Sequence, residues 1–452
     1  MPLSKYITAL QEDPLLSKVV RNSAHLFSNN SLSLALSFLM GILTARLLGA
    51  AGFGLVGLVM GYASTVNSLL SFRMGELVVR YGGEYVERDE KGKASALIKA
   101  AGLTEAFVSL LAFVLVLLTS GLASQYISKI PNTAWMFSFF AVGLLANFNY
   151  ETSIGVLQIT DKIKFLGTIN LIQSIVGVSI ILSAIIWNGG VTVVLLAHLL
   201  SKMILGLGVF VFAQIQLKRI LGVGWWKASF KSISPYRSII HFAISSNISA
   251  TIIKIFRESE ILWVGFFLSA TAAGYYRVAY ILVGLLSVVV DPLIATVYPE
   301  INRLIVQKAW PSLRNFLRKV TTLAFAVNLA AGLGFVLLGR LVLTVYGGGE
   351  EFAVAYPALL ALFVGLAFNY TLFWNRPLLL SLGLPEFPIW VTLVAGMVKV
   401  ALAFWLVPRY GILAAGALLS YYYIASVGVM VLRGLKEIQV RANNALPGEQ
   451  VT

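Results

Sequence analysis

The chain has 452 residues, of which 58% are hydrophobic and only 12% are charged, and its mean hydropathy is +0.86. Because soluble domains carry about 25% charged residues, this composition excludes a soluble protein and predicts an all-α, polytopic membrane protein. The formal net charge of +15 then indicates basic cytoplasmic loops rather than a nucleic-acid partner.

Twelve segments have the apolar composition of membrane-spanning helices, which need about 20 residues each. Turns rich in glycine or proline separate several of them, notably at 49–54, 187–190 and 408–411. The polar stretch 82–93 is expected to be a solvent loop. The predicted spans are residues 23–47, 53–73, 95–119, 132–158, 165–187, 190–217, 239–267, 272–298, 315–338, 353–381, 386–407 and 411–432.

Lysine and arginine fall mostly on one side of this arrangement. If the amino terminus lies in the cytoplasm, the outside loops contain only Lys129, Arg340 and Arg409, whereas the inside loops contain most of the other basic residues. The positive-inside rule therefore predicts a multi-pass protein of the cell (inner or plasma) membrane. Both termini, at 1–22 and 434–452, are expected in the cytoplasm, and no cleavable signal peptide is recognised.

The two halves of the chain repeat each other at an offset of 220 residues. Phe148-Asn149-Tyr150 recurs as Phe368-Asn369-Tyr370, and Gly54 corresponds to Gly274. Each half crosses the membrane an even number of times, so both have the same orientation, as in transporters built from parallel repeats. We expect two pseudo-symmetric six-helix lobes around a central cavity. The predicted domains are the amino-terminal lobe at 23–217, a basic linker at 218–238 with Trp225 and Trp226, and the carboxyl-terminal lobe at 239–433.

Four charges lie close together in the apolar run 241–268. Spacings of i,i+4 and i,i+3 allow Lys254 to pair with Glu258 and Arg257 with Glu260. Near the middle of a bilayer each charge costs several kcal/mol unless it is paired or hydrated. Two interpretations stay open: a self-neutralised structural clasp, and a polar cavity whose pairs exchange partners with a ligand. A loop between two shorter helices is disfavoured because the repeat places the cluster midway along a helix.

Single charges occur in other predicted helices. Glu105 lies in helix three, Glu151 in helix four, Arg376 near the inner end of helix ten, and Lys399 deep in helix eleven. Lys399 is expected to face a cavity, although snorkelling or a partner on a neighbouring helix would also explain it.

Two arginines flank the outside turns, Arg46 in the first lobe and Arg277 in the second. They are candidates for an outer gate or for interfacial anchors, and anchoring is the simpler explanation.

The sequence contains no recognisable catalytic or metal-binding motif. The glycines at 347–349 are not followed by Lys-Ser/Thr, and there is no nucleophile elbow, metal-binding histidine pair or Asp-x-Asp motif. The absence of cysteine excludes disulfides and thiol catalysis. We therefore predict neither an enzyme nor a metal site.

Two stretches are distinctive. The first is TARLLGAAGFGL at 44–55, followed by RYGGEY at 80–85, and the second is RESEILWVG at 257–265, followed by AGYY at 273–276. Both resemble the polysaccharide flippase family of the multidrug/oligosaccharidyl-lipid/polysaccharide (MOP) superfamily, and the similarity extends over nearly the whole chain. Family members usually have an aspartate at the position of Glu260, so the carboxylate is kept although the residue differs.

The resemblance implies alternating access and a polyprenyl-diphosphate-linked oligosaccharide moved from the inner to the outer leaflet. Cations would bind the diphosphate, and polar and aromatic side chains would contact the sugars, with no cofactor. The energy source stays open: carboxylates would bind a coupling H⁺ or Na⁺, or the membrane potential would act directly on charge. The expected partners are membrane lipids and glycan-synthesis enzymes. The protein itself is expected to be a monomer. The candidate residues are Lys254, Arg257, Arg376 and Lys399 for the diphosphate, Asn149, Tyr150, Asn369 and Tyr370 for the sugars, and Glu105, Glu151, Glu258 and Glu260 for the ion.

Three other functions remain open. A drug/cation antiporter of the same superfamily would need an anionic cavity, which the basic excess in the helices disfavours. A membrane glycosyltransferase or glycan polymerase would need a large outer loop or interfacial carboxylates. A protein that had lost transport and become a scaffold for a glycan-synthesis complex would keep the same sequence pattern.

Overall fold

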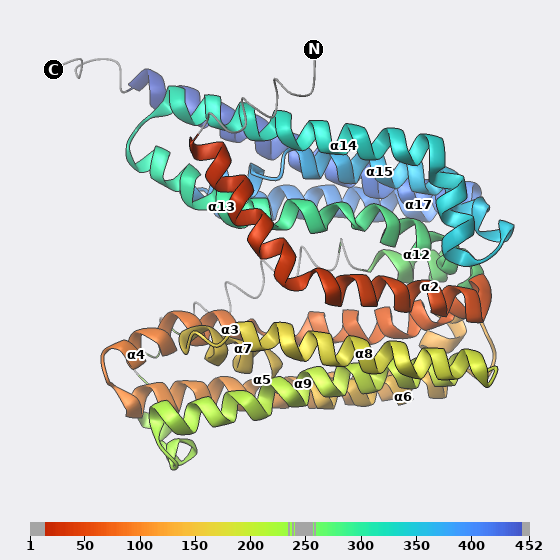
Figure 1. Cartoon of the computed structure of the whole chain (residues 1–452), viewed down its shortest axis with the longest axis horizontal. Helices are drawn as coiled ribbons and strands as arrows, with labels where there is room; N and C mark the ends of the chain where they lie inside the picture. Colours follow the sequence, from red (N-terminus) through yellow and green to blue (C-terminus); the bar gives the residue numbers. More distant parts are fainter. Residues whose placement is uncertain (1–13, 234–235, 237–238, 240–255, 257–258, 445–452) are drawn as a thin grey trace. The chain divides into compact units, whose positions relative to one another are not determined.

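A computed structural model describes residues 14–233, 236, 239, 256 and 259–444, and all regular structure in these residues is helical (Figure 1). The chain divides into two compact units, which are described separately. One unit comprises Leu32–Gly274, and the other comprises Tyr275–Thr452 together with Met1–Ser31.

The unit Leu32–Gly274 contains most helices of the predicted amino-terminal lobe. Figure 1 shows α8 beside α9 and α5 beside α6, and these pairs pack against each other. The elements are α2 (Pro14–Leu70, from Leu32 onward), α3 (Met74–Leu77), the π-helix η1 (Val78–Gly82), α4 (Gly83–Glu87), α5 (Lys91–Leu122), the π-helix η2 (Ala123–Ser128), α6 (Ala134–Ala146), α7 (Tyr150–Ile159), α8 (Lys164–Ile186), α9 (Val191–Leu221), the 3₁₀ helices η3 (Trp225–Lys227) and η4 (Phe230–Ser232), α11 (Glu260–Phe267) and the first turn of α12 (Ala270–Gly284).

Two apolar clusters form the core of this unit. One contains Val59 of α2, Phe137 of α6 and Leu195 of α9, together with residues of α8. The other joins α3, α5 and α7 around Leu97 and Val156, and it also receives partly buried side chains from the 222–233 loop. The first cluster includes residues of α6 and the second includes residues of α7. The chain between these two helices therefore lies where one apolar cluster ends and the other begins.

The second unit is built from long helices that run back and forth. Its elements are the rest of α12, α13 (Leu286–Val306), α14 (Trp310–Gly347), the 3₁₀ helix η5 (Glu350–Ala355), α15 (Tyr356–Thr371), α16 (Asn375–Ser381) and α17 (Phe387–Asn444). The closest pair is α15 and α17 (Figure 1). They lock together where the Gly365 N–H donates to Ser420 Oγ at 2.8 Å, and a Cβ on Gly365 would lie 2.2 Å from the Ser420 Cα.

Two predicted turns are single-residue kinks. Within α2, Gly49 has φ 62° and ψ −177°, and within α17, Gly411 has φ 63° and ψ −145°. Positive φ is costly for residues with a Cβ and easy for glycine. Each glycine therefore forms the turn between two consecutive helices. Both turns lie at boundaries that the sequence predicted.

Eight helices among the described residues are long and apolar enough to cross a membrane. Leu32–Leu70 and Phe387–Asn443 each contain two of the twelve predicted segments, so these eight helices account for ten of them. The predicted fourth helix is divided into α6 and α7, each too short to count, and most of the predicted seventh lies outside the described residues.

The predicted solvent loop at 82–93 is wrong. It is mostly helical, with α4 ending at Glu87 and α5 beginning at Lys91. Tyr85 is buried, and Glu84 pairs with Arg88 one turn later at 2.8 Å. A buried aromatic ring and an i,i+4 ion pair stabilise a helix despite its polar composition.

Candidate functional site

A polar break interrupts the predicted fourth helix inside the first unit. The helix α6 ends at Ala146 and α7 begins at Tyr150, with Asn147, Phe148 and Asn149 in a turn between them. Asparagine side chains compete for backbone hydrogen bonds and so favour turns over helix interiors. Here Asn149 Oδ1 accepts from the Ser153 hydroxyl at 3.1 Å, which fixes the first turn of α7.

Glu105, from the middle of α5, holds this break. Its Oε1 accepts from the Glu151 N–H at 2.7 Å and its Oε2 from the Thr152 N–H at 2.9 Å. These amides belong to the first turn of α7, which has no intrahelical acceptors for them. The side chain is 7% exposed and forms no ion pair with any basic residue that the structure describes. The negative charge is thus stabilised by a helix N-terminus.

A second discontinuity faces the first. Helix α2 ends at Leu70 and α3 begins at Met74, and α3 crosses α7 through two glycines. A Cβ on Gly155 would lie 2.9 Å from the Gly75 carbonyl oxygen, and one on Gly75 would lie 3.3 Å from Glu151 Oε2. The predicted residues Glu105, Asn149 and Glu151 are therefore brought together, with Tyr150 as the first residue of α7.

Two further polar residues lie near this break, and neither was among the predicted site residues. Asn147 Oδ1 is buried without a hydrogen-bond partner in the structure, and it would lie 2.2 Å from a Cβ on Gly206 of α9. One turn earlier on α9, the Lys202 ammonium lies 5.7 Å from the Phe140 ring centroid and pairs with no described carboxylate. Asn147 and Lys202 could have been identified from the sequence, because each is a polar residue within an apolar segment.

The second unit contains a corresponding break between α15 and α16, at residues 372–374. Asn328 of α14 is buried and donates to Thr371 Oγ1 at 3.0 Å, and Trp374 Nε1 donates to Thr321 Oγ1 at 2.7 Å. Both lobes thus break a membrane helix and support the break with a buried polar side chain. The support is a carboxylate in one lobe and a neutral amide in the other.

The remaining candidates of the second unit lie on three different helices. Arg376 is exposed on α16, Asn369 is half-buried on α15 and Tyr370 is buried there. Lys399 is only 3% exposed within α17, with its ammonium 5.2 Å from the Tyr422 ring centroid. A cation above an aromatic ring is partly stabilised by the ring quadrupole.

The charged cluster of the predicted seventh helix is only partly described. Lys254, Arg257 and Glu258 lie outside the described residues, so their pairing stays a prediction. Glu260 is buried at the first position of α11. Arg46 is exposed and Arg277 half-buried, and they belong to different units, so the outer gate also stays a prediction.

The α11–α12 segment packs against α2 through the glycines that the repeat relates. A Cβ on Gly54 would lie 1.8 Å from the Ala270 carbonyl oxygen, and one on Gly274 would lie 2.0 Å from the Ala50 carbonyl oxygen. Nearby, the Lys129 ammonium donates to the Leu268 carbonyl at 3.3 Å. At Gly54 and Gly274 the backbones of α2 and α12 therefore approach more closely than a side chain at either position would permit.

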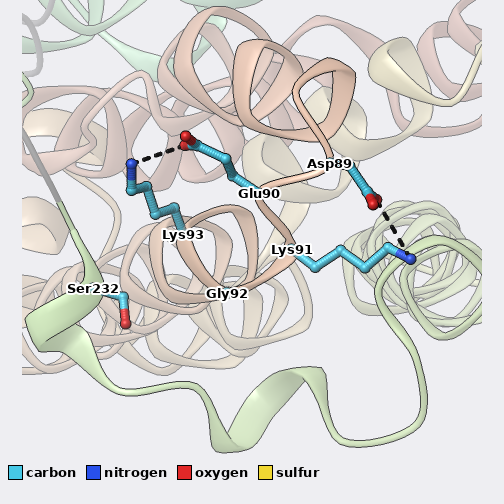
Figure 2. A pocket seen from close by; sticks show the side chains of 6 residues that line it. All are labelled: Asp89, Glu90, Lys91, Gly92, Lys93 and Ser232. Atoms are coloured by element: carbon cyan, nitrogen blue, oxygen red, sulfur yellow. Dashed lines mark ion pairs between the residues drawn. The ribbon is translucent and has the colours of Figure 1, made fainter.

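An open hollow of about 560 Å³ lies where α4 meets α5 (Figure 2). Figure 2 shows its lysines turned toward neighbouring carboxylates, with Lys93 at 2.9 Å from Glu90 and Lys91 at 3.5 Å from Asp89. Because these charges neutralise each other, the hollow is poorly suited to a diphosphate. No cluster of three or more metal-ligating side chains occurs in the described part of the chain.

Comparison with known proteins identifies the family. A family model described as polysaccharide biosynthesis protein matches residues 19–305. The inner membrane protein YghQ of Escherichia coli (strain K12) is 21% identical over 331 residues, which cover 73% of this chain and 92% of YghQ.

Solved structures share the fold. An inward-facing multidrug resistance MATE family transporter of the MOP superfamily superimposes with a TM-score of 0.71 and 14% identity, covering 93% of this chain and 96% of its own. The lipid II flippase MurJ in an inward closed conformation has the same TM-score of 0.71 at 13% identity, covering 93% and 90%. A MOP superfamily transporter from Pyrococcus furiosus, described as having a binding pocket of reverse polarity, has a TM-score of 0.64 at 15% identity, covering 96% and 97%. The chain therefore belongs to the polysaccharide biosynthesis protein family, with the two-lobed fold of the MOP superfamily.

Proposed function

We propose that the protein flips a polyprenyl-diphosphate-linked oligosaccharide from the inner to the outer leaflet of the cell membrane by alternating access. The main structural support is the polar helix break in each lobe, because transporters bind substrates and ions at discontinuous membrane helices. The family match supports a glycan cargo, and MurJ, named as a lipid II flippase, has the same fold. Transport is coupled to an H⁺ or Na⁺ gradient, and both termini face the cytoplasm.

A drug/cation antiporter is the second candidate, because the MATE transporter superimposes as well as MurJ does. A cationic drug requires unpaired carboxylates in its site. The basic residues within the membrane helices, such as Lys202 and Lys399, favour an anionic cargo instead. The family match also favours the flippase, since it covers more than half of the chain.

The proposal predicts that Lys399→Gln lowers the flipping rate at least about tenfold, because one charge-assisted contact is worth roughly 1.5–3 kcal/mol. The same loss is expected for Arg257→Ala. The measurement is the leaflet distribution of a fluorescent polyprenyl-diphosphate oligosaccharide in liposomes that contain the purified protein.

Arg340→Gln is the matched control, because Arg340 is exposed and, among the described carboxylates, pairs with Glu350 at 3.3 Å. It should flip the lipid at the wild-type rate. Full activity of both Lys399→Gln and Arg257→Ala would contradict the cationic site. Uptake of a cationic dye by wild-type liposomes that leave the lipid-linked glycan unflipped would favour the antiporter.

A further inference from the structure

The 218–238 linker carries charge of one sign only. It contains Lys218, Arg219, Lys227, Lys231 and Arg237, and no aspartate or glutamate occurs between Asp161 and Glu258. None of the first four basic residues forms an ion pair with a described carboxylate. This positive charge is therefore available to an external partner.

The linker packs against α5 within the first unit. The Lys99 ammonium of α5 donates to the Ala228 carbonyl at 3.1 Å and lies 4.5 Å from the Phe230 ring centroid. Trp225 and Ile233 pack against the apolar cluster formed by α3, α5 and α7. Two short 3₁₀ helices are thus fixed with one side on α5 and the other side exposed.

Aromatic and basic side chains share the exposed side. Trp226 is 58% exposed, with its indole N–H bonded to the Val223 carbonyl at 3.2 Å and the Lys227 ammonium 5.7 Å from its ring. Val223, Phe230 and Tyr236 are exposed as well. Large apolar side chains beside unpaired lysines are unfavourable in water alone but suit a membrane–water interface, where the rings enter the headgroup layer.

The position of the linker agrees with this environment. It follows directly on α9, one of the helices long and apolar enough to cross a membrane, whose last turn contains Lys218 and Arg219. The neighbouring acidic residues do not neutralise it. Asp89 pairs with Lys91 and Glu90 with Lys93 (Figure 2), and Glu84 pairs with Arg88. Basic residues near an anionic membrane surface are attracted to it, and the attraction adds up over several of them.

We propose that this docked linker is a binding surface for the anionic headgroups of phospholipids in the leaflet next to the end of α9. Lys227 and Lys231 contact the phosphates, and Trp226 inserts beside the glycerol backbone. The surface is independent of the transported cargo. It anchors the first lobe to one leaflet whether or not the proposed flippase function is right.

Brominated lipids test this proposal, because bromine quenches tryptophan fluorescence at short range. The full-length protein is placed in phosphatidylcholine vesicles with 20 mol% of either brominated phosphatidylglycerol or brominated phosphatidylcholine. Subtracting the signal of Trp226→Phe isolates the quenching of Trp226. We expect phosphatidylglycerol to quench Trp226 at least about twofold more than phosphatidylcholine at low ionic strength, and this preference to shrink in concentrated salt.

Lys227→Gln/Lys231→Gln should abolish the preference, and Lys227→Arg/Lys231→Arg should keep it. The matched control is Arg340→Gln/Arg409→Gln, which removes the same two charges from the loops predicted outside and should leave the preference unchanged. Equal quenching by the two lipids in the wild type would overturn the proposal. A preference that survives in Lys227→Gln/Lys231→Gln would overturn it as well.

Discussion

Gly54→Ala is expected to abolish most of the flipping activity and to lower the free energy of unfolding by about 1–3 kcal/mol, as overpacking of a tight contact does. The new Cβ would lie 1.8 Å from the Ala270 carbonyl oxygen, and backbone atoms cannot move aside as a flexible side chain can. The first turn of α12 must therefore separate from α2. We expect the same result for Gly274→Ala, whose Cβ would lie 2.0 Å from the Ala50 carbonyl oxygen.

Liposome flipping and thermal unfolding in detergent provide the two measurements. Gly121→Ala is the control, because a Cβ there has no neighbour within 4 Å and alanine is the better helix former. Since Gly54 and Gly274 share one contact, the double variant should cost less than the sum of the single ones. A Gly54→Ala protein as stable and active as Gly121→Ala would show that this packing is unimportant.

The sequence predicted that these two positions are equivalent, but not that they are in contact. The repeat paired Gly54 with Gly274 because equal positions in two halves keep equal residues. It did not show that the two glycines touch, because an internal repeat reports equivalence and not proximity. The kinks at Gly49 and Gly411 were predictable for a more local reason, since positive φ strongly favours glycine.

The helix breaks were not predictable from hydropathy. A window of about 20 residues averages Asn147 and Asn149 with their apolar neighbours, so the predicted fourth helix ran through them. The break is stabilised by Glu105, 46 residues away, which only the folded unit brings to α7. The repeat was misleading here as well, because it aligned Asn149 with Asn369, whereas the second break lies at 372–374 and Asn369 is helical.

The carboxylates were nevertheless recognised as unusual. Glu105 and Glu151 stood out because an ionisable group inside a membrane helix needs a compensating partner. The partner expected from sequence was a cation or a bound ion. The structure shows instead that Glu105 accepts hydrogen bonds from backbone N–H groups at the start of α7. No pattern of side chains in the sequence reveals such an arrangement.

Glu105→Ala should be the most damaging single substitution in the first lobe. It leaves the N–H groups of Glu151 and Thr152 unpaired in a buried site, and each unsatisfied donor costs about 1–3 kcal/mol. We expect a protein that inserts poorly or unfolds at a clearly lower temperature, with no measurable flipping. Glu350→Gln is the control, because Glu350 is an exposed carboxylate that pairs with Arg340.

Glu105→Gln separates two roles of the carboxylate, because glutamine keeps an acceptor oxygen for α7 but carries no charge. We expect it to restore no more than about half of the stability lost in Glu105→Ala, because one of the two N–H groups keeps an acceptor and the other faces the glutamine NH₂. Flipping rates are then measured with and without an imposed pH gradient. If Glu105 also exchanges the coupling proton, the wild type accelerates with the gradient and Glu105→Gln does not. A glutamine variant that responds to the gradient as the wild type does would restrict Glu105 to holding the break, and the search for the coupling site would move to Glu151 or to the cluster around Glu260.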